Sequence, residues 1–136
     1  MRLKSGIKLL DERPGVGLPA EKGDKVVYNL KIFLNRGDEV PLNQRQVEYL
    51  PSRMIRPVDG YAFVDHSTRL GSRDTMAGVE YALMGMKPGG YRKVRLSPHL
   101  AYRDAGLADL IPANAVLIVE LWLREVVARA HKMDSK

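Results

Sequence analysis

The side chains that usually carry catalysis are few and scattered in this sequence. The three histidines, His66, His99 and His131, form no i, i+4 pair, and cysteine is absent. Because zinc and related ions need clustered nitrogen or thiolate ligands, the sequence predicts no metal site. There is no G-x-S-x-G nucleophile motif, and the glycines of "GVGLPAEKGD" do not follow the phosphate-binding P-loop pattern. We therefore expect no cofactor.

One loop contains more large apolar side chains than surface loops usually do. The segment "SPHLAYRDAGLADLIPANAVLIVEL", 97–121, contains Leu100, Tyr102, Leu107, Leu110 and Ile111. Loops normally lie on the surface, where such side chains are exposed to water. The pattern indicates a loop that covers something or binds something.

The composition bounds the class of protein. With 136 residues, of which 45% are apolar, the sequence predicts a single domain over 1–136 with a short polar tail from about 128. The lack of cysteine suits a reducing compartment, and the start "MRLKSGIKLLDERPG" lacks an apolar core of signal-peptide length. We expect a cytoplasmic protein that does not bind membranes.

The net charge of +6 arises from 22 Lys and Arg against 16 Asp and Glu. Such an excess can serve nucleic acid or an acidic partner, but no basic run is longer than two residues. A solvated basic surface explains the charge, and we do not expect nucleic acid as a partner.

Alternating apolar residues predict the strands of a sheet. After a short strand over 5–11, "KVVYNLKIFLNRGDEV" places Val26, Tyr28, Leu30, Ile32 and Leu34 on one face. "YRKVRLS" alternates in the same way, and a last strand over 115–127 places Leu117, Val119, Leu121 and Leu123 on one face. Residues 41–73 are interrupted by proline and glycine and are expected to be irregular, apart from a short strand at 60–64.

One helix is predicted over about 75–86. Val79, Ala82, Leu83 and Met86 form its apolar stripe, Asp74 or Thr75 is placed to cap its start, and "KPGG" ends it. The sum is an α+β domain in which one curved antiparallel sheet wraps around one short helix.

The stretch "GVEYALMGMKPGGYRKVRLSPHLAYRDAGLADLIPANAVLIVELWLREV" resembles the FKBP-type peptidyl-prolyl cis-trans isomerases. The family pattern there is a helix with G-[W]-E-x-x-[L/V]-x-x-M, a strand ending in S-P, then x-x-A-Y-G, I-P-P and a last strand. Matching positions follow in the same order: Gly78, Glu80, Leu83, Met86, Gly89, Ser97-Pro98, Ala101-Tyr102, Ile111-Pro112, Ala115 and Leu117. The early strand of the family resembles "GDKVVYNLKIFLNRGDEV", so only 41–73 is unmatched.

The resemblance implies a pocket between sheet and helix that binds an X-Pro segment and needs no acid, base or metal. Tyr102 matches the tyrosine whose hydroxyl contacts the substrate carbonyl, and Ile111 matches the apolar lid. Met76 matches a position that contacts the ligand through its backbone N–H. Tyr102 and Ile111 thus match the family's residues, and at Met76 a different side chain is tolerable because the contact is made by the backbone.

The resemblance assigns further positions to the substrate-binding pocket, and at several of them this sequence has an aliphatic residue where the family has an aromatic one. Val79 replaces the floor tryptophan, Leu30 a tyrosine, Val40 the phenylalanine of a Phe-Asp pair, and Val119 an aromatic residue on the last strand. Tyr61 and Phe63 are the candidates for an aromatic residue of the strand before the helix. Because each lost ring removes roughly 0.5–1.5 kcal/mol of stacking, we expect an isomerase of low activity.

Two functions remain open from the sequence. The first is a weak isomerase that binds exposed X-Pro segments and assists folding; the alternative is an inactive binding module of the same fold. A protein partner could use either the groove or an outer face around Trp122, Lys93 and Arg95, because Trp and Arg are enriched in interface hot spots. The apolar residues of 41–73 either fold over the pocket or belong to a partly mobile loop.

Overall fold

The computed structural model describes residues 4–127. One sheet contains β1 (Ile7–Arg13), β2 (Lys25–Leu34), β3 (Glu39–Val40), β6 (His66–Arg69), β7 (Tyr91–Leu96) and β8 (Leu117–Val127), and a second contains β4 (Ile55–Val58) and β5 (Tyr61–Val64). The helices are α1 (Leu42–Gln46) and α2 (Ala77–Leu83), with 3₁₀ turns η1 (Ser52–Met54) and η2 (Pro98–Leu100). The predicted tail from about 128 lies outside the described residues.

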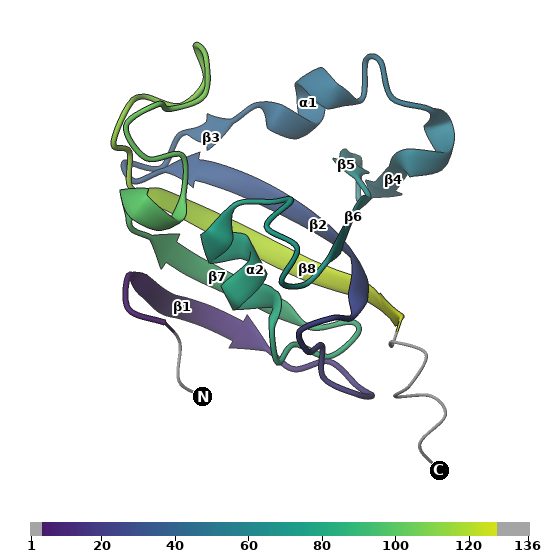
Figure 1. Cartoon of the computed structure of the whole chain (residues 1–136). Helices are drawn as coiled ribbons and strands as arrows, with labels where there is room; N and C mark the ends of the chain where they lie inside the picture. Colours follow the sequence, from purple (N-terminus) through teal and green to yellow (C-terminus); the bar gives the residue numbers. More distant parts are fainter. Residues whose placement is uncertain (1–3, 128–136) are drawn as a thin grey trace.

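The main sheet is antiparallel in the order β1-β7-β8-β2-β3, and β6 also pairs with β2. It curls around α2, which lies across one face of it (Figure 1), so the predicted α+β fold is confirmed. The predicted inward residues of the strands form the core with Val79, Ala82, Leu83 and Met86 of the helical stripe. Within residues 4–127, no helix is long and apolar enough to cross a membrane.

Helix α2 is shorter than predicted at both ends and is capped differently. It starts after Met76 with no side-chain cap, and the hydroxyl of Thr75, one of the two predicted caps, accepts a hydrogen bond from Tyr28. At the other end, Arg92 of β7 donates through Nη1 to the carbonyls of Ala82 and Met84, at 2.8 and 2.9 Å. The sheet therefore satisfies the terminal carbonyls that a local motif was expected to satisfy.

The segment 41–73 is more regular than predicted. The short strand expected at 60–64 is β5, but β4 and β6 were not predicted. Strands β3 and β6 pair with opposite ends of the same edge of β2, and between them buried Asn43 donates to the Leu30 carbonyl at 2.8 Å. The Val64 N–H donates back to the Asn43 side chain at 3.0 Å, so one asparagine ties α1 and β5 to the edge of the sheet.

The β4–β5 hairpin packs on the face of the sheet opposite α2. Phe63 contacts Trp122 with ring centroids 5.0 Å apart, and Trp122 alternates with the core residues of β8. Buried Asn29 donates to the Val64 carbonyl and to Asp65, and Asp65 pairs with Arg56 at 2.8 Å. The hypothesis that this segment folds over the pocket is wrong for its hairpin, because outer-face rings and a polar network hold the hairpin on the other side.

The close contact between α2 and β7 should make Gly78→Ala strongly destabilising. A Cβ at Gly78 would lie 2.7 Å from both Leu96 Cδ atoms and 2.9 Å from the Leu100 carbonyl oxygen. We expect urea unfolding to show a free energy of unfolding lower by about 1–3 kcal/mol, although alanine in place of glycine normally stabilises a helix. The loss should be smaller in the Leu96→Ala background, and a neutral or stabilising Gly78→Ala would contradict the packing.

The hairpin network should make stability depend on the charge of Asp65. Burial raises the pKa of this carboxyl, but hydrogen bonds from Arg56 and Asn29 outweigh it and hold the pKa below its ordinary value of 3.8. A carboxylate with a lowered folded-state pKa stabilises above its unfolded-state pKa and loses that contribution as the pH falls.

Asp65→Asn should therefore lower the free energy of unfolding by about 1–2 kcal/mol near neutral pH. This difference between wild type and variant should shrink as the pH falls below 3.8. Denaturant unfolding over a series of pH values measures it. Asp38→Asn is the matched control, since the Arg36–Asp38 pair is exposed and contributes little. A constant difference between wild type and Asp65→Asn across the acid range would rule out this role of the charge.

Candidate functional site

The loop that drew attention in the sequence folds over one end of the helix–sheet core. Ile111 is buried and forms an isolated bridge with Leu107, whose N–H donates to the Ile111 carbonyl at 2.9 Å. Tyr102 is half-buried and packs against the core cluster, as do Leu107 and Leu110. The apolar side chains of this loop thus cover the core, and Tyr102 keeps part of its surface in contact with water.

The aliphatic positions predicted to line the pocket come together under this loop. Leu30, Val40, Val79, Val119 and Ile111 all belong to the core cluster, with exposed fractions of 5%, 3%, 0%, 0% and 2%. Residues this deeply buried offer no surface to a ligand in this conformation. Among the predicted site residues in this region, only Tyr102 and Met76 remain partly accessible.

Two aromatic residues that the family pattern did not identify lie beside these positions. Tyr28 of β2 is 3% exposed, its ring stacks on His66 with centroids 5.4 Å apart, and its hydroxyl donates to Thr75 Oγ1 at 3.3 Å. The alternation of β2 did place Tyr28 inward. His66 could not be found, because strand β6 was not predicted.

Burial shifts three titratable side chains here toward their neutral forms: Tyr102, Tyr28 and His66. Burial raises the pKa of Tyr102, and it also raises the pKa of Tyr28, against a lowering by the hydrogen bond to Thr75. Burial lowers the pKa of His66, although the charge of Asp65 opposes this. These three side chains therefore present uncharged hydroxyl and ring groups beside an apolar core, which suits binding an amide better than transferring protons.

Tyr61 and Phe63 do not lie with the other predicted site residues. Both belong to β5, where their rings pack together with centroids 4.5 Å apart. Lys31 lies over the Tyr61 ring at 4.1 Å, on the outer face of the sheet. Their assignment to the pocket came from an alignment across the segment 41–73, and the structure places His66 of β6, not these rings, on the strand that directly precedes α2.

The predicted partner face around Trp122 is largely occupied by the chain itself. Trp122 lies between Phe63 and Tyr91, with the Tyr91 ring centroid 5.2 Å away, and it is only partly exposed. Lys93 and Arg95 share its face of the sheet on the neighbouring strand β7. Trp122 does lie on the outer face of the sheet, but the chain's own rings pack against it, and nothing in the structure supports a partner-binding face here.

The described residues contain no group of three or more His, Cys, Asp or Glu side chains that could hold a metal ion. What the site can do is therefore set by shape and by a few hydrogen bonds. A short helix in a curled antiparallel sheet, closed by a loop with a half-buried tyrosine, is the arrangement that defines the class of this domain.

Comparison with known proteins identifies the class. The FKBP-type peptidyl-prolyl cis-trans isomerase family matches residues 18–124. The chain is 25% identical over 126 residues to FK506-binding protein 4 of Chaetomium thermophilum, which covers 93% of this chain and 22% of that protein. It is 41% identical over 51 residues to FK506-binding protein 1A of Neurospora crassa, covering 38% of this chain and 42% of that protein.

A third relative is the mouse peptidyl-prolyl cis-trans isomerase FKBP10, 36% identical over 76 residues that cover 51% of this chain and 13% of that protein. The matches span less than half the length of each of these curated relatives. Because the family match covers most of the chain, the chain belongs to the FKBP-type peptidyl-prolyl cis-trans isomerase family. This membership supports an isomerase-like function.

Proposed function

We propose that this chain is a peptidyl-prolyl cis-trans isomerase of low activity that binds X-Pro segments and assists their folding. The observation that carries the proposal is that Tyr102 and Met76 stay partly accessible while they pack against an aliphatic floor that includes Val79 and Val119. Family membership and the printed names of relatives such as FKBP10 support the reaction class. The shallow, aliphatic floor supports the low rate.

The reaction requires no charged catalyst. An X-Pro bond isomerises over a barrier of about 18–20 kcal/mol because resonance gives its C–N bond partial double-bond character. An apolar, water-poor surface disfavours the charge-separated planar amide relative to the twisted one. In this proposal Tyr102 donates a hydrogen bond to the substrate carbonyl, and the burial that raises its pKa keeps its hydroxyl protonated.

The second candidate is a binding module of the same fold without turnover. The observation that favours it is the deep burial of Leu30, Val40 and Val79, at 5%, 3% and 0% exposure, which leaves no depth for a proline ring unless the loop moves. A protein segment would then be held at the surface around Met76 and Tyr102. The two candidates differ in whether the exchange rate of a bound X-Pro peptide increases.

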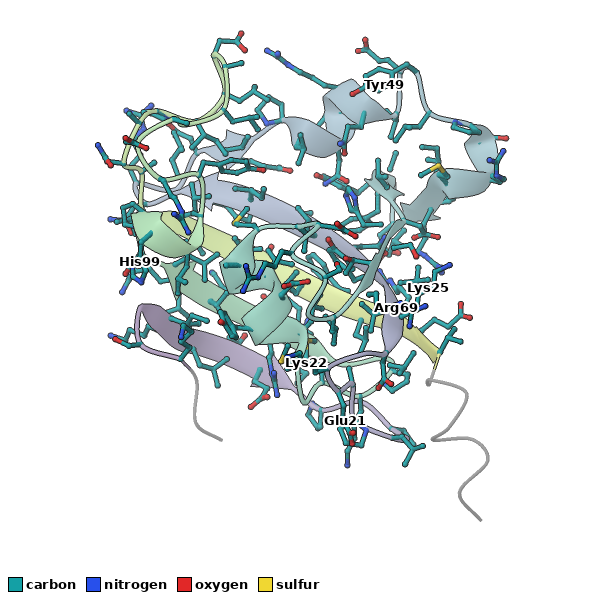
Figure 2. The ribbon with its side chains drawn as sticks, viewed as in Figure 1. Glu21, Lys22, Lys25, Tyr49, Arg69 and His99 are labelled. Carbon is teal, nitrogen blue, oxygen red and sulfur yellow. The ribbon has the colours of Figure 1, made fainter. Side chains whose placement is uncertain are left out.

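If the isomerase proposal holds, Tyr102→Phe should lower the catalysed exchange of a short X-Pro peptide about fivefold, the value of one hydrogen bond of about 1 kcal/mol. Magnetisation-transfer NMR of cis and trans peptide signals measures the rate. Tyr49→Phe is the matched control, because Tyr49 is 73% exposed (Figure 2), and it should leave the rate unchanged.

An exchange rate that saturating wild-type protein does not change would reject the isomerase and leave the binding module. An equal rate for wild type and Tyr102→Phe would remove the proposed role of the hydroxyl while keeping the activity.

A further inference from the structure

A large groove lies over the face of α2 that points away from the sheet. Its volume is about 860 Å³, and Met76, Ala77, Glu80, Tyr81 and Met84 of the helical region line it. Their spacing of three and four residues puts them opposite the stripe of α2 that enters the core. Lys22 and His99 both line the groove, and Figure 2 shows them on either side of α2.

The groove is strongly basic. Lys4, Lys22, Arg73 and Arg103 line it together with His99, whereas Glu80 is its one acidic lining residue among those described. Glu80 is 6% exposed, and its Oε2 accepts hydrogen bonds from the backbone N–H groups of Gly71 and Arg73, both at 3.2 Å.

Within residues 4–127, none of the four Lys and Arg side chains of the groove forms a salt bridge. These charges are not neutralised inside the described chain and attract an acidic ligand.

Two of these arginines occupy backbone positions that favour glycine. Arg103 has φ of 55° and Arg73 has φ of 66°, both in the left-handed region that side chains with a Cβ rarely adopt. The Arg103 backbone is held by hydrogen bonds from its N–H to the Pro98 carbonyl at 2.9 Å and from the Asn114 N–H to its own carbonyl at 2.7 Å. These backbone conformations set where the two arginine side chains leave the chain, and both arginines line the groove.

The floor of the groove is apolar between the charges, which decides the kind of ligand. Met76 and Met84 are partly buried against the core, and Tyr81 is 37% exposed beneath Lys4, whose Nζ lies 4.9 Å from the ring centroid. A polypeptide can present apolar side chains between acidic ones. A nucleic acid binds through its phosphates and through bases stacked on aromatic rings, and the Tyr81 ring of this groove already carries Lys4, so a peptide matches the groove better.

The groove adjoins the proposed proline site. Met76 and Ala101 line it, and Ala101 and Arg103 flank Tyr102 in the chain. We propose that the groove binds acidic side chains of the polypeptide whose X-Pro bond lies at Tyr102, so that the preferred substrates carry Asp or Glu close to the proline. This substrate preference rests on the proposed function, whereas binding of acidic peptide in the groove does not.

The test compares two labelled peptides that each contain one X-Pro bond, flanked by glutamates in one and by glutamines in the other. Fluorescence anisotropy at low salt measures their affinities for the full chain. The acidic peptide should bind about tenfold more tightly, and the difference should shrink as salt is added.

Arg103→Gly distinguishes a loss of peptide binding from a loss of folding, because the two should change in opposite directions. This change removes a charge and relieves the left-handed backbone, so the acidic peptide should bind about threefold more weakly while Tm rises by a few degrees. Arg73→Glu should weaken binding further. Arg53→Glu is the matched control, because Arg53 is exposed on η1 and does not line the groove, and it should leave the affinity unchanged.

Equal affinities for the two peptides, or an Arg73→Glu variant that binds the acidic peptide as wild type does, would overturn the proposal. So would a single-stranded RNA or DNA oligonucleotide that binds more tightly than the acidic peptide, since the groove would then be a nucleic-acid site.

Catalysed exchange of the neutral peptide without any acidic preference would reject the groove and keep the isomerase. Acidic-peptide binding sensitive to Arg73→Glu, without exchange, would keep the groove and reject the isomerase.

Discussion

The close approach of α2 to the sheet is the constraint on which the rest of the structure depends. Gly78 has no side chain, so the helix backbone lies directly against Leu96 of β7 and the carbonyl of Leu100 in η2. The same contact fixes the start of the loop that carries Tyr102, because η2 leads into it. Arg92 then holds the other end of the helix through two carbonyls. Helix, loop and sheet are therefore placed by one packing contact and one buried arginine.

This arrangement explains how the fold persists while its pocket changes. The aliphatic residues at the family's aromatic positions are fully packed, with Val79 and Val119 at 0% exposure. Nearby, Tyr28 and His66 supply aromatic rings from the sheet rather than from the helix. The proposed function needs only an apolar surface and a hydroxyl group, and the half-buried Tyr102 packed against this cluster provides both.

The sequence predicted the elements whose apolar periodicity is local to one strand or one helix. The alternation of β2 and β8 and the stripe of α2 identified the core, because each of these elements buries one face. The cap predicted at Asp74 or Thr75 is absent: the helix starts only after Met76, and the Thr75 hydroxyl accepts a hydrogen bond from Tyr28, which lies 47 residues away in sequence. The β4–β5 hairpin was not predicted for a similar reason: the contacts of Asn29 with Val64 and Asp65 are non-local, and no periodicity reveals them. The family pattern located Tyr102 but could not show how far the floor beneath it is closed.

The most direct test of this account is chemical-shift mapping with a short X-Pro peptide on isotope-labelled protein. The account predicts that peptide binding shifts the backbone amides of Met76 and Tyr102 and leaves the Trp122 indole N–H unchanged, because Trp122 lies on the opposite face of the sheet under Phe63. Shifts confined to Trp122 and its neighbours, with none at Met76 or Tyr102, would contradict it.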